Sequence, residues 1–376
     1  MRPRCWAEID LEAIRHNAAV CRTAAPPHNR LMAIVKADAY GHGVEAVARA
    51  LADCVEGFGV ANVTEAEGLA KTLGTVHAGR VLILGPVLPE ERIPAIDGNF
   101  AVPVSNHEEV DAFLLAAKAV GKSARVHAVV NTGMGRMGAQ PEALPDLIEH
   151  IRNLKEQTRG AIVLDGVASH FPSADEESEF TRSQIARFQA LIASLKLGPE
   201  VRIHLANSAG LLEFGPQLGF TTESRPGLAI YGVAPVARHQ SRLHPAMMWK
   251  TRVTLVREIQ PGDTISYGRT FVAKAPMRAA TLAVGYADGY PRSLSGNGAD
   301  VLIGGRRCPL LGRVTMDQVI VDVTDLPTPP LPGDEVVLMG QQENEIIHAA
   351  ELAEKAGTIP WEILTGITGR VARRYR

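Results

Sequence analysis

The segment LMAIVKADAYGHGVEAVARAL, residues 31–51, sets a pattern that recurs between Asp10 and Gly232. It opens with a short apolar run, Leu31 to Val35, and passes through a glycine-containing turn. From Val44 it continues with apolar residues at spacings of three and four. The run is typical of a strand buried in a parallel sheet, and the spacing is typical of a surface helix. The segment therefore predicts one strand followed by one helix.

Seven more apolar, β-branched runs repeat this unit. The eight expected strands are 31–35, 57–61, 81–84, 101–104, 125–130, 162–168, 201–205 and 222–231. Segments with helical spacing lie between them, such as 44–53, 65–73, 107–120, 142–156 and 177–195. Eight strand-then-helix units predict an α/β fold, the (β/α)8 TIM barrel.

A second, mostly β domain is expected after the barrel. Past Tyr231 the chain changes to closely spaced extended runs separated by Pro-Gly and Gly-Gly turns. These runs are 252–258, 280–285, 301–303, 319–323 and 335–339. Residues 1–9 also look extended, before Asp10 caps a first helix from Leu11 to Cys21, and we expect them to pair with the second domain. The predicted domains are 10–235 for the barrel and 236–376, with 1–9, for the β domain.

Composition excludes several classes of function. The chain has 376 residues with 39 Lys and Arg against 41 Asp and Glu, so its net charge of −2 offers no field for nucleic acid or an anionic membrane. No stretch of ~18 apolar residues and no signal sequence is present, which predicts a cytoplasmic protein without a membrane segment. Four isolated cysteines lack ligand spacing, so no metal site is predicted.

Reactive residues stand where the predicted barrel strands end, which is where active sites of this fold lie. These residues are Lys36, Arg136, His170, His204, Asn207, Ser208, Arg225 and Gly227. Lys36 follows an apolar strand, so desolvation would lower its pKa and favour an imine with a carbonyl compound. The alternative is a lysine whose ammonium reaches out of the strand end into water.

The other residues at the strand ends have two interpretations each. His170 and His204 could be ordinary core histidines, and the glycine turns could be only turns. Arg136 and Arg225 require anionic or acceptor partners, however, and Ser208 precedes a predicted helix, a favourable place for phosphate. Together these residues fit an aldehyde cofactor that carries a phosphate, namely pyridoxal 5'-phosphate. In the β domain Tyr267 and Tyr286 stand beside glycines, where a packed aromatic side chain with its hydroxyl at the surface is the ordinary interpretation. The same domain carries the pair Met316-Asp317.

At these positions the chain resembles the alanine racemase family, the fold-type III pyridoxal phosphate enzymes, nearly from end to end. The similar segments are Trp6 to Leu11, Val35 to Gly43, Thr132 to Arg136, Ser169 to Phe171, His204 to Ser208, Arg225 to Gly227, Ser266 to Gly268, Gly285 to Arg292 and Val314 to Asp317. The resemblance implies an isomerase that interconverts L-alanine and D-alanine, a small-molecule amino acid substrate, through proton abstraction at Cα. D-alanine for cell-wall synthesis is the product it suggests.

The resemblance also implies roles for individual residues. Lys36 corresponds to the Schiff-base lysine and one base, and Tyr267 to the opposing base, which reaches the shared active site of the other subunit in a homodimer. Racemisation needs one base on each face of the planar carbon, which this pair provides. His170 would support Tyr267, with Arg225 and His204 behind it.

The remaining implied roles concern binding. Arg225 would meet the pyridine nitrogen and weaken the electron sink, because a guanidinium keeps its proton. Contacts to the cofactor are implied for Tyr40, Asn207, Ser208, Gly227, Leu228 and Trp361. Arg136 and the backbone of Met316 would hold the substrate carboxylate, Tyr286 would line the entrance, and Asp317 would support the site from outside.

Three positions depart from the family pattern. Val129 stands where members often have a carbamylated lysine and Asn131 where they have an aspartate, so Arg136 lacks its usual anionic support or recruits chloride or water. Trp361 replaces a tyrosine whose hydroxyl meets the phosphate. These departures leave a serine or broad-specificity racemase open. A non-catalytic pyridoxal phosphate carrier lacks a second domain, and a fold-type III decarboxylase has an acidic residue at the position of Arg225.

Overall fold

The computed structural model describes residues 3–74 and 79–376. Residues 1–2, the start of the expected extended segment 1–9, and residues 75–78 lie outside the described part. The chain divides into two compact units. The barrel unit comprises Ile14–Ala39 and Val44–His244, and the second unit comprises Met1–Ala13, Tyr40–Gly43 and Pro245–Arg376.

The barrel unit is a closed barrel of parallel strands, which confirms the predicted TIM barrel. Its strands are β2 (Arg30–Ile34), β3 (Gly57–Val60), β4 (Val81–Ile83), β5 (Ala101–Val104), β6 (Ala124–Val129), β7 (Ile162–Ala168), β8 (Arg202–His204) and β9 (Glu223–Ser224). Strands such as β3 and β5 are buried along their whole length, because neighbouring helices cover one face and the barrel interior covers the other.

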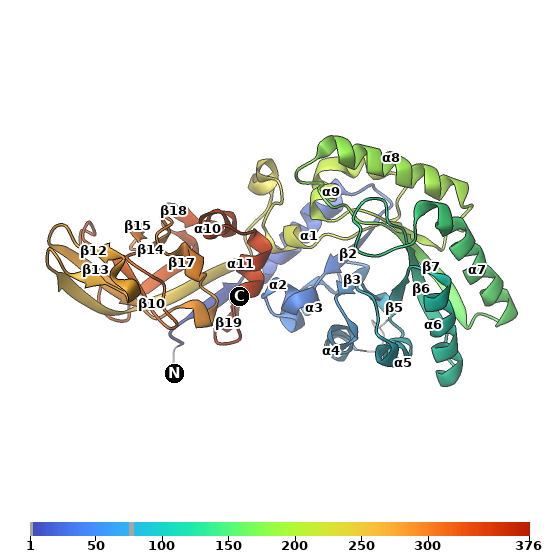
Figure 1. The fold of residues 1–376 in the computed structure, drawn as a ribbon, viewed down its shortest axis with the longest axis horizontal. Coiled ribbons are helices and arrows are strands. Elements are labelled where there is room, and N and C mark those ends of the chain that lie inside the picture. The colour runs from blue at the N-terminus through green and yellow to red at the C-terminus, as the bar shows by residue number, and fades with distance from the viewer. Residues whose placement is uncertain (1–2, 75–78) are drawn as a thin grey trace. The chain divides into compact units, whose positions relative to one another are not determined.

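Helices surround these strands (Figure 1). They are α1 (Leu11–Ala24), α2 (Lys36–Tyr40), α3 (Val44–Leu51), α4 (Val63–Leu73), α5 (Arg92–Asp97), α6 (His107–Val120), α7 (Leu144–Gln157), α8 (Ser178–Ser194) and α9 (Ser208–Phe214). Their ends follow sequence rules: Asn106 Oδ1 accepts a hydrogen bond from Glu109 N at 2.8 Å to begin α6, and Gly121 ends it at φ 66°. Among the described residues, no helix is long and apolar enough to span a membrane.

The predicted strand 222–231 is wrong over most of its length. Strand β9 ends at Ser224, and Leu228–Tyr231 form a short 3₁₀ helix, η5. Pro226 lacks an N–H group, and the amides of Gly227 and Ala229 donate to the Ser208 hydroxyl rather than to a neighbouring strand. Ladder pairing therefore stops where the backbone turns toward Ser208.

A nine-stranded sheet forms the second unit, in agreement with its predicted β character. Its strands are β1 (Trp6–Ile9), β10 (Met247–Ile259), β13 (Met277–Leu282), β14 (Asp300–Ile303), β15 (Arg306–Pro309), β16 (Val319–Asp322), β17 (Glu335–Gln342), β18 (Glu345–Ile347) and β19 (Ala372–Tyr375). Strand β1 pairs antiparallel with β10 and parallel with β19, as expected for an extended N-terminal segment. Helices α10 (Ala349–Ala356) and α11 (Pro360–Gly366) also belong to this unit.

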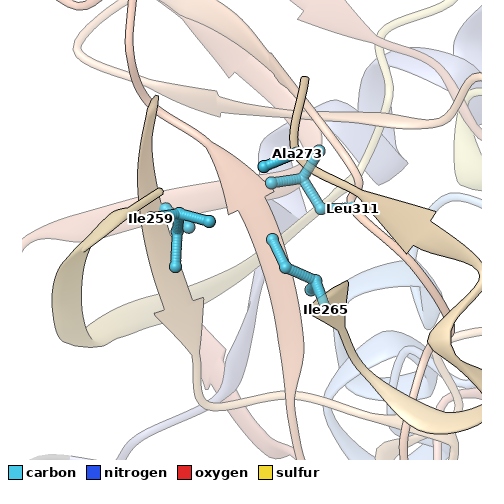
Figure 2. Packing of buried hydrophobic residues seen from close by; sticks show 5 residues of the cluster. Ile259, Ile265, Ala273 and Leu311 are labelled. Atoms are coloured by element: carbon cyan, nitrogen blue, oxygen red, sulfur yellow. The ribbon is translucent and has the colours of Figure 1, made fainter. Parts of the chain in front are cut away.

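A small hydrophobic cluster anchors the hairpin of β11 (Thr264–Ile265) and β12 (Phe271–Val272). Figure 2 shows Ile259, Ile265, Ala273 and Leu311, which pack together with Ala279. The hairpin carries the segment Ser266 to Gly268 at its turn. Because an isolated two-stranded hairpin is marginal in water, this cluster is what holds the turn in place.

Candidate active site

Lys36 follows β2 and begins an unusual turn. Ala37, Asp38 and Ala39 all have φ between 52° and 54° and ψ near 50°, and Tyr40 follows with φ 54°, so four successive non-glycine residues have positive φ. Each such residue costs about 1–2 kcal/mol, so the surroundings must impose the conformation. Glu65 contributes, since its Oε1 accepts from Ala37 N at 2.8 Å. The Tyr231 hydroxyl also donates to Ile34 O at 2.8 Å and fixes the strand end.

The environment of Lys36 favours its neutral amine. Burial lowers the pKa of Lys36, the positive charge of Arg136 lowers it further, and Glu65 only partly opposes them. This direction is the one predicted from the apolar strand. A neutral amine has the lone pair that an imine-forming or proton-abstracting lysine requires.

Arg136 is presented by a loop that closes on itself after β6. Asn131 N donates to Ala139 O and Ala139 N to Val129 O, both at 2.8 Å. The Asn131 side chain shapes the turn, since its Oδ1 accepts from Gly133 N at 3.1 Å and from Gly135 N at 2.9 Å. Asn131 therefore contributes loop structure, and Arg136 is left exposed at the surface of the barrel unit.

Ser208 and η5 form a polar cradle. The Ser208 Oγ accepts from Gly227 N at 2.9 Å and from Ala229 N at 3.1 Å. Asn207 Oδ1 caps α9 by accepting from Gly210 N at 2.9 Å. The N–H of Leu228 stands at the first position of η5, where an N–H group has no partner within the helix. Helix N-termini with such amides favour anions.

Arg225 is buried, and its guanidinium is surrounded by acceptors. It donates to Ser169 O at 2.7 Å, to His170 Nδ1 at 3.2 Å and to His204 Nδ1. Burial lowers the pKa of Arg225 to about 10, with Glu223 opposing and Arg136 adding to the shift. The group therefore remains a cation at neutral pH.

Of the two predicted histidines, His204 is buried and His170 is half-buried, and both have a lowered pKa. Burial lowers the pKa of His170 to about 3, and the charges of Arg225, Arg136 and Lys36 lower it further. Burial also lowers the pKa of His204 well below its ordinary value, with Arg225 as the next cause. The residues expected at the strand ends are thus close enough for their charges to act on one another.

Sequence reasoning missed three residues that organise this region. Gln184 of α8 donates to Thr132 Oγ1 at 2.7 Å and to His170 O at 2.8 Å, so it joins the loops after β6 and β7. His127 lies 2.7 Å from His204 and 3.1 Å from Asp165, measured between the bonded side-chain atoms. A charged Asp165 inside the apolar run 162–168 was the available signal.

The second unit places three predicted site residues at its surface. Tyr267 is 72% exposed, Met316 is 52% exposed and Tyr286 is 42% exposed. The turn of Tyr267 is nevertheless ordered by contacts, because Ser266 Oγ donates to Arg313 O at 2.6 Å.

Asp317, Trp361 and Tyr40 also belong to the second unit. Arg370 donates to Asp317 Oδ1 at 2.9 Å, and the Met316 carbonyl accepts from Ala287 N at 3.0 Å, so the Met316 turn is fixed. Trp361 is half-buried on α11. Tyr40 is buried, and burial raises its pKa to about 12.

The barrel residues define a chemical capability. An amine of lowered pKa, a buried guanidinium and a cradle of amides with a hydroxyl can bind a carbonyl compound that carries a phosphate. Within the described residues, no cluster of His, Cys, Asp or Glu has the arrangement of a metal site. The amine, the guanidinium and the amides with the Ser208 hydroxyl are the donors that fit an organic phosphate.

Two family profiles match the chain. The profile described as "Alanine racemase, N-terminal domain" matches residues 9–235. The profile described as "Alanine racemase, C-terminal domain" matches residues 246–375. The two matches lie in the same order along the chain as the two units of the structure.

Individual relatives are similar over the full length. An alanine racemase of Symbiobacterium thermophilum is 42% identical over 385 residues, which cover 100% of this chain and 97% of the relative. An alanine racemase of Methylacidiphilum infernorum is 40% identical over 378 residues, covering 100% and 93%. The crystal structure of alanine racemase from Bacillus anthracis with bound L-Ala-P has a TM-score of 0.87 at 32% identity, covering 100% of this chain and 96% of that chain.

Proposed function

The chain belongs to the alanine racemase family, and from this membership we propose that it is a homodimeric, cytoplasmic enzyme that interconverts L-alanine and D-alanine with pyridoxal 5'-phosphate. The observation that carries the proposal is the convergence on His170. This residue is hydrogen bonded to Arg225 and feels the charges of Lys36 and Arg136. The three residues to which we assign the reactive amine, the substrate contact and the cofactor contact, Lys36, Arg136 and Arg225, thus all act on one residue of the barrel unit.

The donor set supports binding of this cofactor. Lys36 would hold it through its amine, Arg225 would face the ring nitrogen, and Ser208 with the amides of Gly227 and Leu228 would hold the phosphate. Tyr40, Asn207 and Trp361 are proposed as further contacts. When bound, the group supplies an aldehyde for the amino group of the substrate and an electron-withdrawing ring.

Arg225 limits what that ring can do. A guanidinium donates hydrogen bonds but does not give up its proton at neutral pH, since even the lowered pKa is about 10. A ring nitrogen that receives no proton from Arg225 would withdraw electron density from Cα less strongly. This restraint favours return of the proton to Cα over protonation elsewhere, which is the outcome that racemisation requires.

We assign the two proton transfers at Cα to Lys36 and Tyr267. Lys36 Nζ takes or returns the proton on one face, and burial with the charge of Arg136 lowers its pKa in the direction that favours the proton-accepting amine. Tyr267 Oη acts on the other face, and its exposure of 72% supports a role toward a second subunit. Arg136 and the backbone of Met316 hold the substrate carboxylate, while Tyr286 and Asp317 shape the approach to it.

His170 is the proposed support for the Tyr267 phenolate. Its Nδ1 accepts a hydrogen bond from Arg225 Nη2 at 3.2 Å, so the neutral ring carries its own proton on Nε2. An Nε2–H group can donate to a phenolate and stabilise it. In this scheme residues 10–235 bind the cofactor, and residues 236–376 with 1–9 deliver the second base to the partner subunit.

The first test is loss of optical rotation from L-alanine, L-serine and a longer amino acid, with pyridoxal phosphate supplied. We expect fast racemisation of alanine that Tyr267→Phe abolishes. Tyr290→Phe is the matched control, because Tyr290 is a buried tyrosine of the same unit whose hydroxyl has no partner among the described residues. Cofactor binding without racemisation of any substrate would contradict the enzyme and favour a carrier.

A serine or broad-specificity racemase is the second candidate, because Val129 and Trp361 differ from the family pattern. Specificity constants for alanine and serine in the wild type and in Trp361→Tyr decide between the two. Alanine turnover at least tenfold above serine in both proteins supports the alanine enzyme. A preference for serine that Trp361→Tyr reverses supports the alternative.

A further inference from the structure

A line of hydrogen bonds extends through the barrel from Arg225 to an acidic residue that the sequence did not single out. Arg225 contacts His204 Nδ1, and His204 Nε2 lies 2.7 Å from His127 Nδ1. His127 Nε2 in turn lies 3.1 Å from Asp165 Oδ2. Both histidines are 1% exposed, so water does not complete their hydrogen bonding.

The donors in this line determine where every proton lies. Arg225 can only donate, so His204 Nδ1 must be bare and a neutral His204 carries its proton on Nε2. That proton points at His127 Nδ1, which must therefore accept. His127 then carries its proton on Nε2 and donates it to Asp165. Each group donates to the next in one direction, from the cation to the carboxylate.

Asp165 is held as the anionic end of the line. Arg125 Nη2 donates to its Oδ2 at 2.8 Å, and Arg202 Nη2 donates to the same atom. Burial opposes ionisation, but the hydrogen bond from His127 and these two cations hold the pKa of Asp165 well below its ordinary value. Burial lowers the pKa of His127 to about 4 against the pull of Asp165, so the ring is neutral.

The backbone of β7 is adapted to His127. A side chain at Gly166 would place its Cβ 2.5 Å from His127 Nδ1 and 2.6 Å from its Cε1. Glycine at this position therefore admits the imidazole between β6 and β7. The same two-residue segment, Asp165-Gly166, supplies both the acceptor and the space for the donor.

We propose that Asp165 and His127 are positioning residues, which act through His204 to hold the Arg225 guanidinium in one orientation and one hydrogen-bonding state. Neither touches the proposed cofactor site, and the consequence for racemisation rests on the function proposed above. The acceptor of Arg225 is the His204 ring, which cannot rotate away because His127 fixes its orientation and Asp165 fixes that of His127. This is an outer layer of support for a buried cation.

The direct test is the protonation of the histidine rings. Nitrogen-15 solid-state NMR of histidine-labelled protein at pH 7.5 distinguishes the two neutral tautomers from the cation, and His127→Leu and His204→Leu spectra assign the signals. We expect both rings to be neutral with the proton on Nε2. In Asp165→Asn we expect both tautomers to be kept, because the two arginines and His127 all donate to one oxygen, Oδ2, which the amide oxygen can replace, and Arg225 still fixes the proton of His204 on Nε2. A cationic His127, or a proton on Nδ1 of either ring in the wild type or in Asp165→Asn, overturns the proposal.

A kinetic arm separates positioning from mere stability. His127→Leu should lower kcat about tenfold with little change in the KM for alanine. Val126→Ala, which truncates a buried neighbour on the same strand, is the control and should leave kcat near the wild-type value. Equal losses in both variants overturn the positioning role. If the wild type racemises nothing, the proposed function fails, while the NMR result still tests the line of hydrogen bonds.

Discussion

At the scale of single residues, the barrel keeps His127, His170 and His204 neutral where free histidine titrates. The pKa of His170 is lowered to about 3 and that of His127 to about 4, chiefly by burial. In the unfolded chain each has a pKa of about 6.5. Below about pH 6.5 these histidines bind protons in the unfolded chain but stay unprotonated in the folded barrel. The free energy of unfolding must therefore fall as the pH falls.

The predicted loss is about 1.4 kcal/mol per pH unit for each histidine between roughly pH 6.5 and 4. Far-UV circular dichroism during urea unfolding measures the barrel, since most described helices belong to it. Tryptophan fluorescence reports the second unit, because Trp6, Trp249 and Trp361 all lie there. A barrel transition of equal free energy at pH 7.5 and pH 5.5 would falsify this account of the histidines.

The sequence could identify site residues at the ends of strands but not those inside a strand. Lys36 was predicted because it follows a strand, and Arg225 because it is a charged residue on the last barrel strand, near the barrel end where this fold keeps its reactive groups. His127 lies in the middle of β6 and looked like part of a buried run. Its role depends on Asp165, which is 38 positions away and adjacent only through the pairing of β6 with β7. Such side-chain pairing across a barrel has no local sequence signal.

At the scale of elements, the left-handed turn after Lys36 leads us to predict that an alanine-to-glycine substitution raises stability, the opposite of its effect in a right-handed helix. Ala37→Gly should raise the stability of the barrel by about 1 kcal/mol, because glycine adopts φ 52° without the Cβ penalty. The control Ala46→Gly, in the right-handed helix α3, should lower stability by about 1 kcal/mol. Urea unfolding followed by circular dichroism compares the two, and a loss of stability in both would mean that Ala37 is not left-handed.

The hairpin that carries Tyr267 depends on its small core. Leu311→Ala should lower the stability of the second unit by about 2–3 kcal/mol and also lower kcat, because the turn of Tyr267 loses its anchor. Leu326→Ala removes a buried leucine of the same unit outside the cluster and should lower stability alone. Fluorescence-monitored unfolding and racemisation rates measure both effects. Equal kcat values for the two variants would contradict the anchoring role.

Elements with strong periodicity were predictable, and those defined by tertiary hydrogen bonds were not. The expected helix 107–120 has the bounds of α6, since Asn106 and Gly121 mark its ends. The expected strand 222–231 was wrong because the Ser208 hydroxyl captures the amides of Gly227 and Ala229. These hydrogen bonds join Ser208 to residues 19 and 21 positions further along the chain, so they cannot be deduced from an apolar run.

At the scale of the whole molecule, the sequence predicted both the barrel and the family, because motif order and spacing carry that information along the chain. The structure confirmed the barrel, and the family profiles confirmed the family. The sharing of active sites between subunits stays a prediction. Its physical support is the exposure of Tyr267, Met316 and Tyr286 on one unit, while Lys36 and its partners belong to the other. The prediction is that each complete site combines Lys36 of one chain with Tyr267 of the other.

The most direct measurement of this claim is the activity of heterodimers purified through two different tags. A dimer of one Lys36→Ala chain and one Tyr267→Phe chain contains one intact shared site, so we predict about half of wild-type activity. A dimer of one wild-type chain and one chain with both substitutions contains no intact shared site and should be inactive. The reverse pattern, an inactive first dimer and a half-active second, would show that Lys36 and Tyr267 act within a single chain and would contradict the account.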